Sequence, residues 1–193
     1  MATSKAVLLA VLFLLLAFLI FDFIASSGRE HITKPSAVSA DSPSEQPAEA
    51  EQTKKVTLFF LREDDGLLIP EEREIRSEAA VTREAEETIA QLIKGSTSGL
   101  VSALPPETKL WRLFVTKEGV AYADFSKDLT VKHPSGSAAE ISTVFAIVNT
   151  LTYNFKPIKK VFILIDGEEQ ETLGGHIRLD WAFLPNYSLV AKD

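Results

Sequence analysis

The chain has 193 residues, of which 46% are hydrophobic and 24% are charged, so it can bury the core of one ordinary domain with segments to spare. Its formal net charge is −7, which argues against nucleic-acid binding, because nucleic-acid-binding proteins present basic surfaces to the phosphates. Cysteine is absent, which excludes disulfides, thiolate metal sites, thiol catalysis and the lipid-bearing cysteine of a lipoprotein.

The first 27 residues contain an apolar run over positions 6–25 that is interrupted only by Asp22. At about 1.5 Å per residue, this run matches a hydrocarbon layer of roughly 30 Å and predicts a transmembrane helix. The small residues at 25–27 leave a cleaved secretory signal open, but the run exceeds the roughly 7–15 residues of a signal core, which favours an uncleaved anchor. Because Lys5 precedes the span, we expect a cytoplasmic N-terminus and an extracytoplasmic C-terminal domain, in the periplasm or on the external face.

Residues 28–53 are rich in Pro, Ser, Ala and acidic side chains and have little to bury, which predicts a disordered tether. The folded part then covers residues 54–193, where 17 Lys and Arg against 21 Asp and Glu leave a net charge of −4. The sequence therefore predicts a membrane anchor at 1–27, a tether at 28–53 and one exported domain at 54–193.

The domain begins with a β-rich run at residues 54–61 that is apolar on both faces, as expected of a covered strand. Residues 67–75 suit either a small hairpin or an irregular arm around Pro70. A helix follows from Thr82, with apolar residues at helical spacing, three glutamates near its start and Gly95 directly after its last apolar pair. Strands at 110–115 and 120–125 are joined by TKEG, which has the length and the glycine of a hairpin connection.

A second helix is predicted from Ser137, because Ser137 and Glu140 have the spacing of a capping box. Its expected buried stripe is amphipathic and comprises Ala138, Ile141, Val144, Phe145, Val148 and Leu151. A last apolar strand at 159–165 precedes the acidic segment DGEEQE. The order βαββαβ predicts an α+β two-layer sandwich, a mixed sheet with two helices on one face, and leaves the strand order open.

The segment GSTSG at residues 95–99 contains the glycines and hydroxyls of several catalytic and phosphate-binding loops. A serine nucleophile elbow has a strand before it and a helix after it, whereas here the central residue is Thr97 and the helix comes first. A phosphate cradle needs the N-terminus of a helix, and Gly95 follows a C-terminus. We therefore interpret Gly95 as a left-handed helix cap and the next residues as a turn.

Other chemistry-bearing residues have competing interpretations. Asp124, Ser126 and Asp128 are close enough in sequence for a hydrolase site, but they also suit the exit from a strand. The three histidines, His31, His133 and His176, are too scattered for a metal cluster. The acidic segment at 166–171 lacks the ligand spacing of a calcium loop and predicts a solvated turn. Neither a metal nor a cofactor is expected.

Two surface features bear on partners. The lysines at 156, 159 and 160 form a small basic patch, which suits either an acidic partner or anionic lipid, or else the solvated entrance to a strand. Trp111 and Trp181, with Phe183, suit either a core or an interaction face, and we expect core packing.

Several segments occur together in an order that resembles the GerMN domain family. The matching segments are VTLFFL, GLLIPEEREI, LIKG, GLVSALPPETKL, GVAYADFSKDL, EISTVFAIVNTLTYNF and KKVFILIDG, over residues 55–167. The resemblance implies a non-enzymatic extracytoplasmic domain without catalytic residues. It also implies similarity to the ring-building modules of secretion and sporulation complexes, in which small α+β domains pack side by side through helices and sheet edges.

We therefore expect a single-pass protein whose GerMN-like domain is a non-enzymatic interaction or assembly module in the bacterial cell envelope. Its expected partners are envelope proteins or further copies of itself, its membrane contact lies at residues 6–25, and nucleic acid is excluded. The alternative is a sensor of small ligands or glycans, since small α+β domains bind metabolites at an edge or interface. A third hypothesis is a hydrolase that uses Asp124, Ser126 or Asp128.

Overall fold

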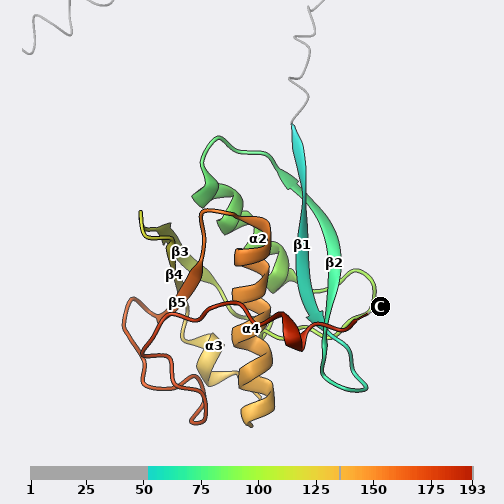
Figure 1. The fold of residues 1–193 in the computed structure, drawn as a ribbon. Helices are drawn as coiled ribbons and strands as arrows, with labels where there is room; N and C mark the ends of the chain where they lie inside the picture. The colour runs from blue at the N-terminus through green and yellow to red at the C-terminus, as the bar shows by residue number, and fades with distance from the viewer. Residues whose placement is uncertain (1–51, 135, 193) are drawn as a thin grey trace, which may run out of the picture. The chain divides into compact units, whose positions relative to one another are not determined.

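The computed structural model describes residues 52–134 and 136–192 of the chain (Figure 1). The predicted anchor at 6–25 and nearly all of the predicted tether lie outside the described residues. Within the part that is described, no helix combines the length and the apolar character needed to cross a membrane.

Two strands at the start of the domain form a sheet of their own. β1 (Thr53–Leu61) and β2 (Leu68–Arg76) are antiparallel, with Thr57 opposite Glu72 and Phe59 opposite Pro70. A proline is tolerated here because β2 has only one strand beside it, so the missing N–H costs no ladder bond. Of the two options for residues 67–75, the hairpin is the one observed.

The second sheet has the order β3-β4-β5. β3 (Leu110–Val115) and β4 (Val120–Phe125) are antiparallel and have the predicted bounds. Their turn needs glycine, because Gly119 has φ 83° and a Cβ there would lie 2.8 Å from the carbonyl oxygen of Pro157. β5 (Lys160–Ile165) is parallel to β4, so a crossover must connect them, and α3 (Asp128–Val131) and α4 (Ser137–Asn154) provide it.

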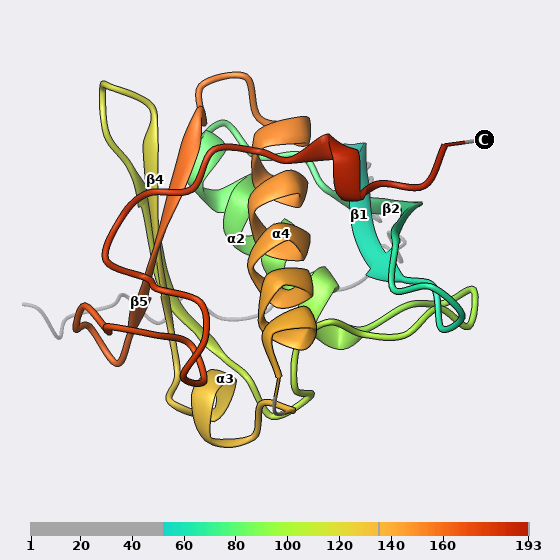
Figure 2. The ribbon, with the colours of Figure 1, turned by 60° about the horizontal axis from the view of Figure 1, so that its bottom comes forward.

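The helices α2 (Val81–Lys94) and α4 lie between the two sheets (Figures 1 and 2). The predicted single sheet with both helices on one face is therefore wrong. The free edge of β1 is occupied by α4, not by another strand: the amide of Thr57 donates to Asn154 Oδ1 at 2.8 Å and Asn154 Nδ2 donates to the carbonyl of Thr57 at 2.7 Å. Because its edge is satisfied in this way, β1 cannot join the second sheet.

Helix α4 is buried on most of its circumference, so the predicted one-sided stripe is wrong. Ala138 is exposed, whereas Ala146 and Ile147, outside that stripe, are fully buried. A helix covered on several sides has no polar face to give to solvent. Its buried polar residues instead bond to neighbouring backbone, as Thr150 does by accepting from the amide of Phe59 at 3.2 Å.

The predicted capping box at the start of α4 is also wrong. The N-cap is Gly136, without a side-chain cap, and Glu140 is buried beneath the loop around His176. Its carboxylate accepts from the amides of Ile177 at 2.8 Å and His176 at 3.1 Å, and contacts His176 Nδ1 at 2.6 Å. Burial raises the pKa of Glu140, but these hydrogen bonds outweigh it and lower the pKa to about 2.

The C-terminal segment crosses α4 and joins the two sheets (Figure 2). Phe183 and Val161 exchange backbone hydrogen bonds of 2.7 and 2.9 Å, which covers the outer edge of β5. The segment then forms the 3-10 helix η1 (Tyr187–Leu189), and the amide of Ala191 donates to the carbonyl of Leu68 in β2 at 2.9 Å. The C-terminal segment therefore links β5 of the second sheet to β2 of the first.

Candidate protein-docking surface

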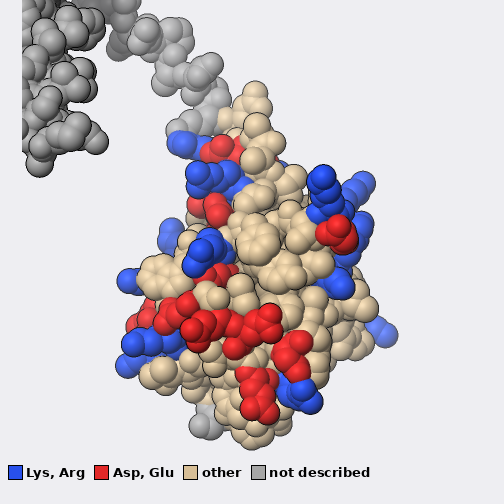
Figure 3. Space-filling model, turned by 90° about the vertical axis from the view of Figure 1, so that its left-hand side faces the viewer, with Lys and Arg blue, Asp and Glu red and all other residues tan. Residues whose placement is uncertain are grey.

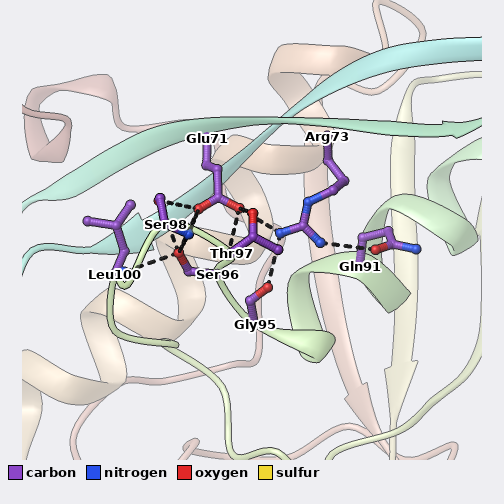
Figure 4. A network of polar contacts seen from close by, with 8 residues as sticks. All are labelled: Glu71, Arg73, Gln91, Gly95, Ser96, Thr97, Ser98 and Leu100. Carbon is purple, nitrogen blue, oxygen red and sulfur yellow. Dashed lines mark hydrogen bonds and ion pairs between the residues drawn. The ribbon is translucent and has the colours of Figure 1, made fainter.

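The GSTSG segment, singled out by sequence, folds around the carboxylate of Glu71 (Figure 4). Glu71 accepts from Ser96 Oγ at 2.6 Å and from the amides of Thr97 and Ser98 at 3.1 and 3.2 Å. Arg73 Nη2 lies 2.6 Å from the same carboxylate. Burial raises the pKa of Glu71, but the hydrogen bonds from Ser96, Ser98 and Arg73 hold it well below its usual range.

The loop is therefore structural, as its sequence context predicts. Its three hydroxyls donate to the buried carboxylate of Glu71. Gly95 does end α2 at a positive φ of 95°, but its ψ of 173° is not that of the expected left-handed cap. The Gly95 carbonyl accepts instead from Arg73 Nη2 at 3.1 Å, which joins the helix end to the Glu71 network.

Asp124, Ser126 and Asp128 form structural contacts at the end of β4. Asp124 is buried and accepts from the amide of Gly167 at 2.7 Å and from Arg112 Nε at 2.9 Å. Ser126 Oγ accepts from the amide of Lys109 at 3.1 Å and donates to Asp128 Oδ2 at 3.2 Å. These bonds organise the strand exit, which is the second of the two interpretations of this segment.

The predicted histidine and acidic candidates do not meet in a metal site. His133 contacts Thr143 Oγ1 at 2.8 Å, while His176, which lies on a different loop, pairs with Glu140 of α4. Within residues 52–134 and 136–192, no group of three or more His, Asp or Glu side chains could hold a metal ion. Asp166 and Gly167 form a tight turn after β5, with φ of 50° and 82°, as a solvated turn requires.

The aromatic residues that were expected in the core divide into two groups. Phe183 is buried, but Trp111 and Trp181 are 54% and 48% exposed, so core packing is wrong for both tryptophans. Trp111 lies over the end of β5, where its Nε1 donates to Asp166 Oδ1 at 2.8 Å. Trp111 therefore contributes to the solvent-exposed surface of the second sheet.

The outer face of β3-β4-β5, which points away from the helices, carries a row of three aromatic rings. Phe114 lies opposite Tyr122 in the register, and Tyr122 lies opposite Phe162. Phe114 is 47% exposed, and Tyr122 and Phe162 are half-buried. The next row towards the end of β5 contains Arg112 and Asp124, which form an ion pair on the same face. We name Phe114, Tyr122 and Phe162 the aromatic row.

The rings of the aromatic row stack on one another. The centroids of Phe114 and Tyr122 are 4.7 Å apart with an interplanar angle of 4°, and those of Tyr122 and Phe162 are 5.4 Å apart at 26°. The first separation equals the spacing of adjacent strands, about 4.8 Å, so the ring planes stand upright on the sheet. Both faces of Tyr122 are covered by the neighbouring rings, and Phe114 and Phe162 each turn one face to Tyr122.

Figure 3 shows this side of the molecule, where an uncharged centre has mostly Lys and Arg groups above it and mostly Asp and Glu groups directly below it. An apolar centre with a charged rim is the arrangement found in protein interfaces. The solvated face of a sheet normally carries polar residues. A continuous row of aromatic residues on such a face therefore indicates a binding surface.

Comparison with known proteins then identifies the domain. A family model described as sporulation and spore germination matches residues 57–171, which is more than half of the chain. The chain belongs to this family.

Solved structures support the same assignment. The chain is similar to a Clostridium perfringens protein assigned as a lipoprotein, with 25% identity, a TM-score of 0.50 and coverage of 68% of this chain and 87% of that one. It is also similar to the first GerMN domain of GerM from Bacillus subtilis, with 21% identity, a TM-score of 0.53 and coverage of 68% and 97%. The predicted GerMN resemblance is confirmed.

The tandem GerMN domains of the same B. subtilis protein match with 21% identity and a TM-score of 0.55, over 69% of this chain and 46% of that one. The chain thus spans about half the length of the tandem structure. Both likenesses to GerM show the fold alone. Among curated proteins, none matches the chain.

Both outer edges of the second sheet of this GerMN domain have at least one backbone amide that is already bonded. The edge of β5 is covered by Phe183, as described above. The edge of β3 faces α2 across an open groove, where Glu86 Oε1 accepts from the amide of Leu113 at 3.4 Å. An edge whose amide is partly satisfied by an acidic side chain resists strand addition. The aromatic row is therefore the more available surface for docking.

Sequence reasoning missed the aromatic row, although a signal for it was present. In each strand of the second sheet, inward residues such as Leu113, Ala123 and Ile163 alternate with outward aromatics. A strand that reads apolar at every position is usually assigned to a sheet covered on both faces. The sequence pattern of each strand does not reveal how the strands align. Three aromatics on three strands form a row only when the register places them opposite one another.

Proposed function

We propose that this GerMN domain is a non-enzymatic protein-docking module of the bacterial cell envelope, held at the membrane by residues 6–25 and exposed outside the cytoplasm. The family assignment and the likeness to a protein assigned as a lipoprotein support the location. The solvent-exposed aromatic row on the outer face of β3-β4-β5 carries the docking function.

The ring geometry favours a protein partner over a glycan. Sugars stack on the open faces of aromatic rings, whereas Phe114 and Tyr122 turn their faces to each other. Ring edges and the neighbouring Leu164 suit the irregular apolar surface of a protein. The alternative of a small-ligand sensor would use the open groove between α2 and the edge of β3.

The non-enzymatic part of the proposal is supported by the fate of the hydroxyl candidates. Ser96 and Ser98 donate to Glu71, and Ser126 donates to Asp128. A serine nucleophile needs a base strong enough to take its proton. The pKa of Glu71 is held well below its usual range, which makes this carboxylate a weak base for Ser96 and Ser98.

The experiment uses the full chain in intact cells that are treated with formaldehyde. Phe114→Thr with Phe162→Thr removes two rings and keeps good strand formers. Burying the exposed parts of the two rings is worth about 2 kcal/mol together, so we expect adducts with envelope proteins, or with the chain itself, to fall roughly 30-fold.

The matched control is Lys55→Thr with Glu72→Thr on the outer face of the β1-β2 sheet, where the two side chains form an exposed ion pair. Its adducts should equal those of the unchanged chain. If the control and the aromatic variant gave the same adducts, the proposed docking surface would be wrong.

A further inference from the structure

The two ends of the three-stranded sheet carry charges of opposite sign. At one end, the β3-β4 turn contains the exposed Lys117, and next to it Lys159 precedes β5, which begins at Lys160. Lys160 alternates with buried Val161, so it points to the same outer face as Phe162. Glu118 is the acidic residue in this turn. We name this the basic end.

At the other end, β5 passes directly into the exposed acidic residues Asp166, Glu168 and Glu169. At this end Arg112 pairs with buried Asp124, while Lys109, over the ring of Trp111, and the exposed Lys127 offset only part of this negative charge. We name residues 166–169 the acidic end. The aromatic row lies between the two ends, because Phe162 is in the middle of β5.

This arrangement is complementary to itself. A two-fold axis that lies in the face and crosses the strands brings the aromatic row of one copy onto that of another. The same rotation places the basic end of each copy over the acidic end of the other, so both charged contacts form at once. We infer that the docking partner is a second copy of this chain, bound face to face; this inference rests on the proposed docking function.

The size of the face sets the strength of this contact. Three strands of six residues cover roughly 14 by 20 Å, about 280 Å² per copy, which is below the roughly 800 Å² per partner of a standard specific interface. Such a dimer is transient for free domains in dilute solution. A membrane anchor raises the effective concentration of the two copies, so the same small face can pair on a membrane.

The test uses charge reversal in the full chain reconstituted into liposomes. The basic-end variant is Lys117→Glu with Lys160→Glu, and the acidic-end variant is Glu168→Lys with Glu169→Lys. Since the chain lacks cysteine, Lys192→Cys gives one site for a donor or acceptor dye in every sample. Energy transfer between labelled copies then measures self-association, and the thermal midpoint of each variant checks its folding.

Each variant alone should associate at least tenfold more weakly than the unchanged chain, because both charged contacts become repulsive. An equal mixture of the two variants should regain the transfer, since each reversed end then faces its complement. The N-terminal segment is identical in all samples, so association through it would persist in the single variants.

The inference is overturned if the unchanged chain shows no energy transfer. It is also overturned if either variant alone associates as strongly as the unchanged chain, or if the mixture of the two variants stays dissociated. Its failure is separable from that of the proposed function. When Phe114→Thr with Phe162→Thr still removes adducts in cells, the partner is a different protein and the docking face stands. When the double variant Phe114→Thr with Phe162→Thr also has no effect in cells, the proposed docking function and the inferred self-association are both wrong.

Discussion

The outer face of the β1-β2 sheet carries the exposed pair Lys55 and Glu72, whereas the outer face of β3-β4-β5 carries the aromatic row. Both sheets enclose the same helices, and both bury aliphatic residues on the inner side. A sheet face that meets only water gains nothing from exposed aromatics. On the first sheet the outward Phe59 is buried against Tyr153 and Tyr187, whereas Phe114 of the aromatic row stays 47% exposed. The difference indicates that the second sheet has a surface to bind.

The same contrast holds for the polar groups. On the β1-β2 side, Glu71 and Arg73 are buried and bonded to the loop after α2, so their charges are satisfied within the domain. On the β3-β4-β5 side, the charges at the basic and acidic ends are exposed. The Glu71 network therefore stabilises the fold, whereas the charged groups at the basic and acidic ends remain accessible to a partner.

The largest expected effect comes from opening the Glu71 network. Glu71→Ala removes the acceptor of the 96–98 loop and leaves the guanidinium of Arg73, which is 13% exposed, without its carboxylate. Breaking a buried ion pair from one side costs about 3–5 kcal/mol, so the free energy of unfolding should fall by that amount in chemical denaturation.

Glu72→Ala is the matched control, because Glu72 is adjacent in β2 and points to the solvent. Its loss should change the free energy of unfolding by no more than about 0.5 kcal/mol. Equal effects of the two substitutions would show that the Glu71 network contributes nothing to the fold.

The next effect is a pH dependence that arises at Glu140. Its pKa is about 2 in the folded state, below the ordinary 4.5, so folding is favoured by the ionised form. The stabilisation is complete above pH 4.5 and is lost as the pH falls towards 2, by up to about 3 kcal/mol. Glu140→Gln should lower stability at neutral pH and remove this share of the acid-dependent loss.

Thermal unfolding across pH 2–7 measures the effect. Because the pKa of Glu71 is also lowered, the Glu140→Gln variant should still lose some stability at low pH. An unchanged pH profile in Glu140→Gln would mean that this carboxylate is not held by the amides of His176 and Ile177.

The smallest effect on stability is expected from the docking face itself. Phe162→Thr loses one stacked contact with Tyr122, which is worth about 1 kcal/mol. The domain should therefore keep its fold and its far-ultraviolet circular dichroism while it loses docking. A drop of 3 kcal/mol or more would instead assign the row to the core.

Local patterns predicted much of the fold, and distant contacts account for the errors. The β3-β4 hairpin matched its expected bounds because alternation and a glycine turn are encoded within sixteen residues. The position of α4 could not be predicted, because Asn154 bonds with Thr57 and Glu140 with His176, far away in the chain. A serine three residues before a glutamate indicates a capping box only when no other partner competes for the carboxylate.

The same reasoning applies to the candidate site. The structural role of GSTSG followed from the helix that precedes it, but Glu71, its partner, is 25 residues away and nothing local identifies it. The exposure of Trp111 and the alignment of the aromatic row depend on strand register and on which face the helices cover. These are tertiary properties, and a single strand does not encode them.

The central claim is that docking uses the outer face of β3-β4-β5, and one measurement tests it most directly. A photo-reactive amino acid is placed in the full chain either at Phe162 or, on the other sheet, at Glu72, and intact cells are illuminated. We expect protein adducts from position 162 and none above background from position 72. Adducts from position 72 alone, or from neither position, would contradict the account.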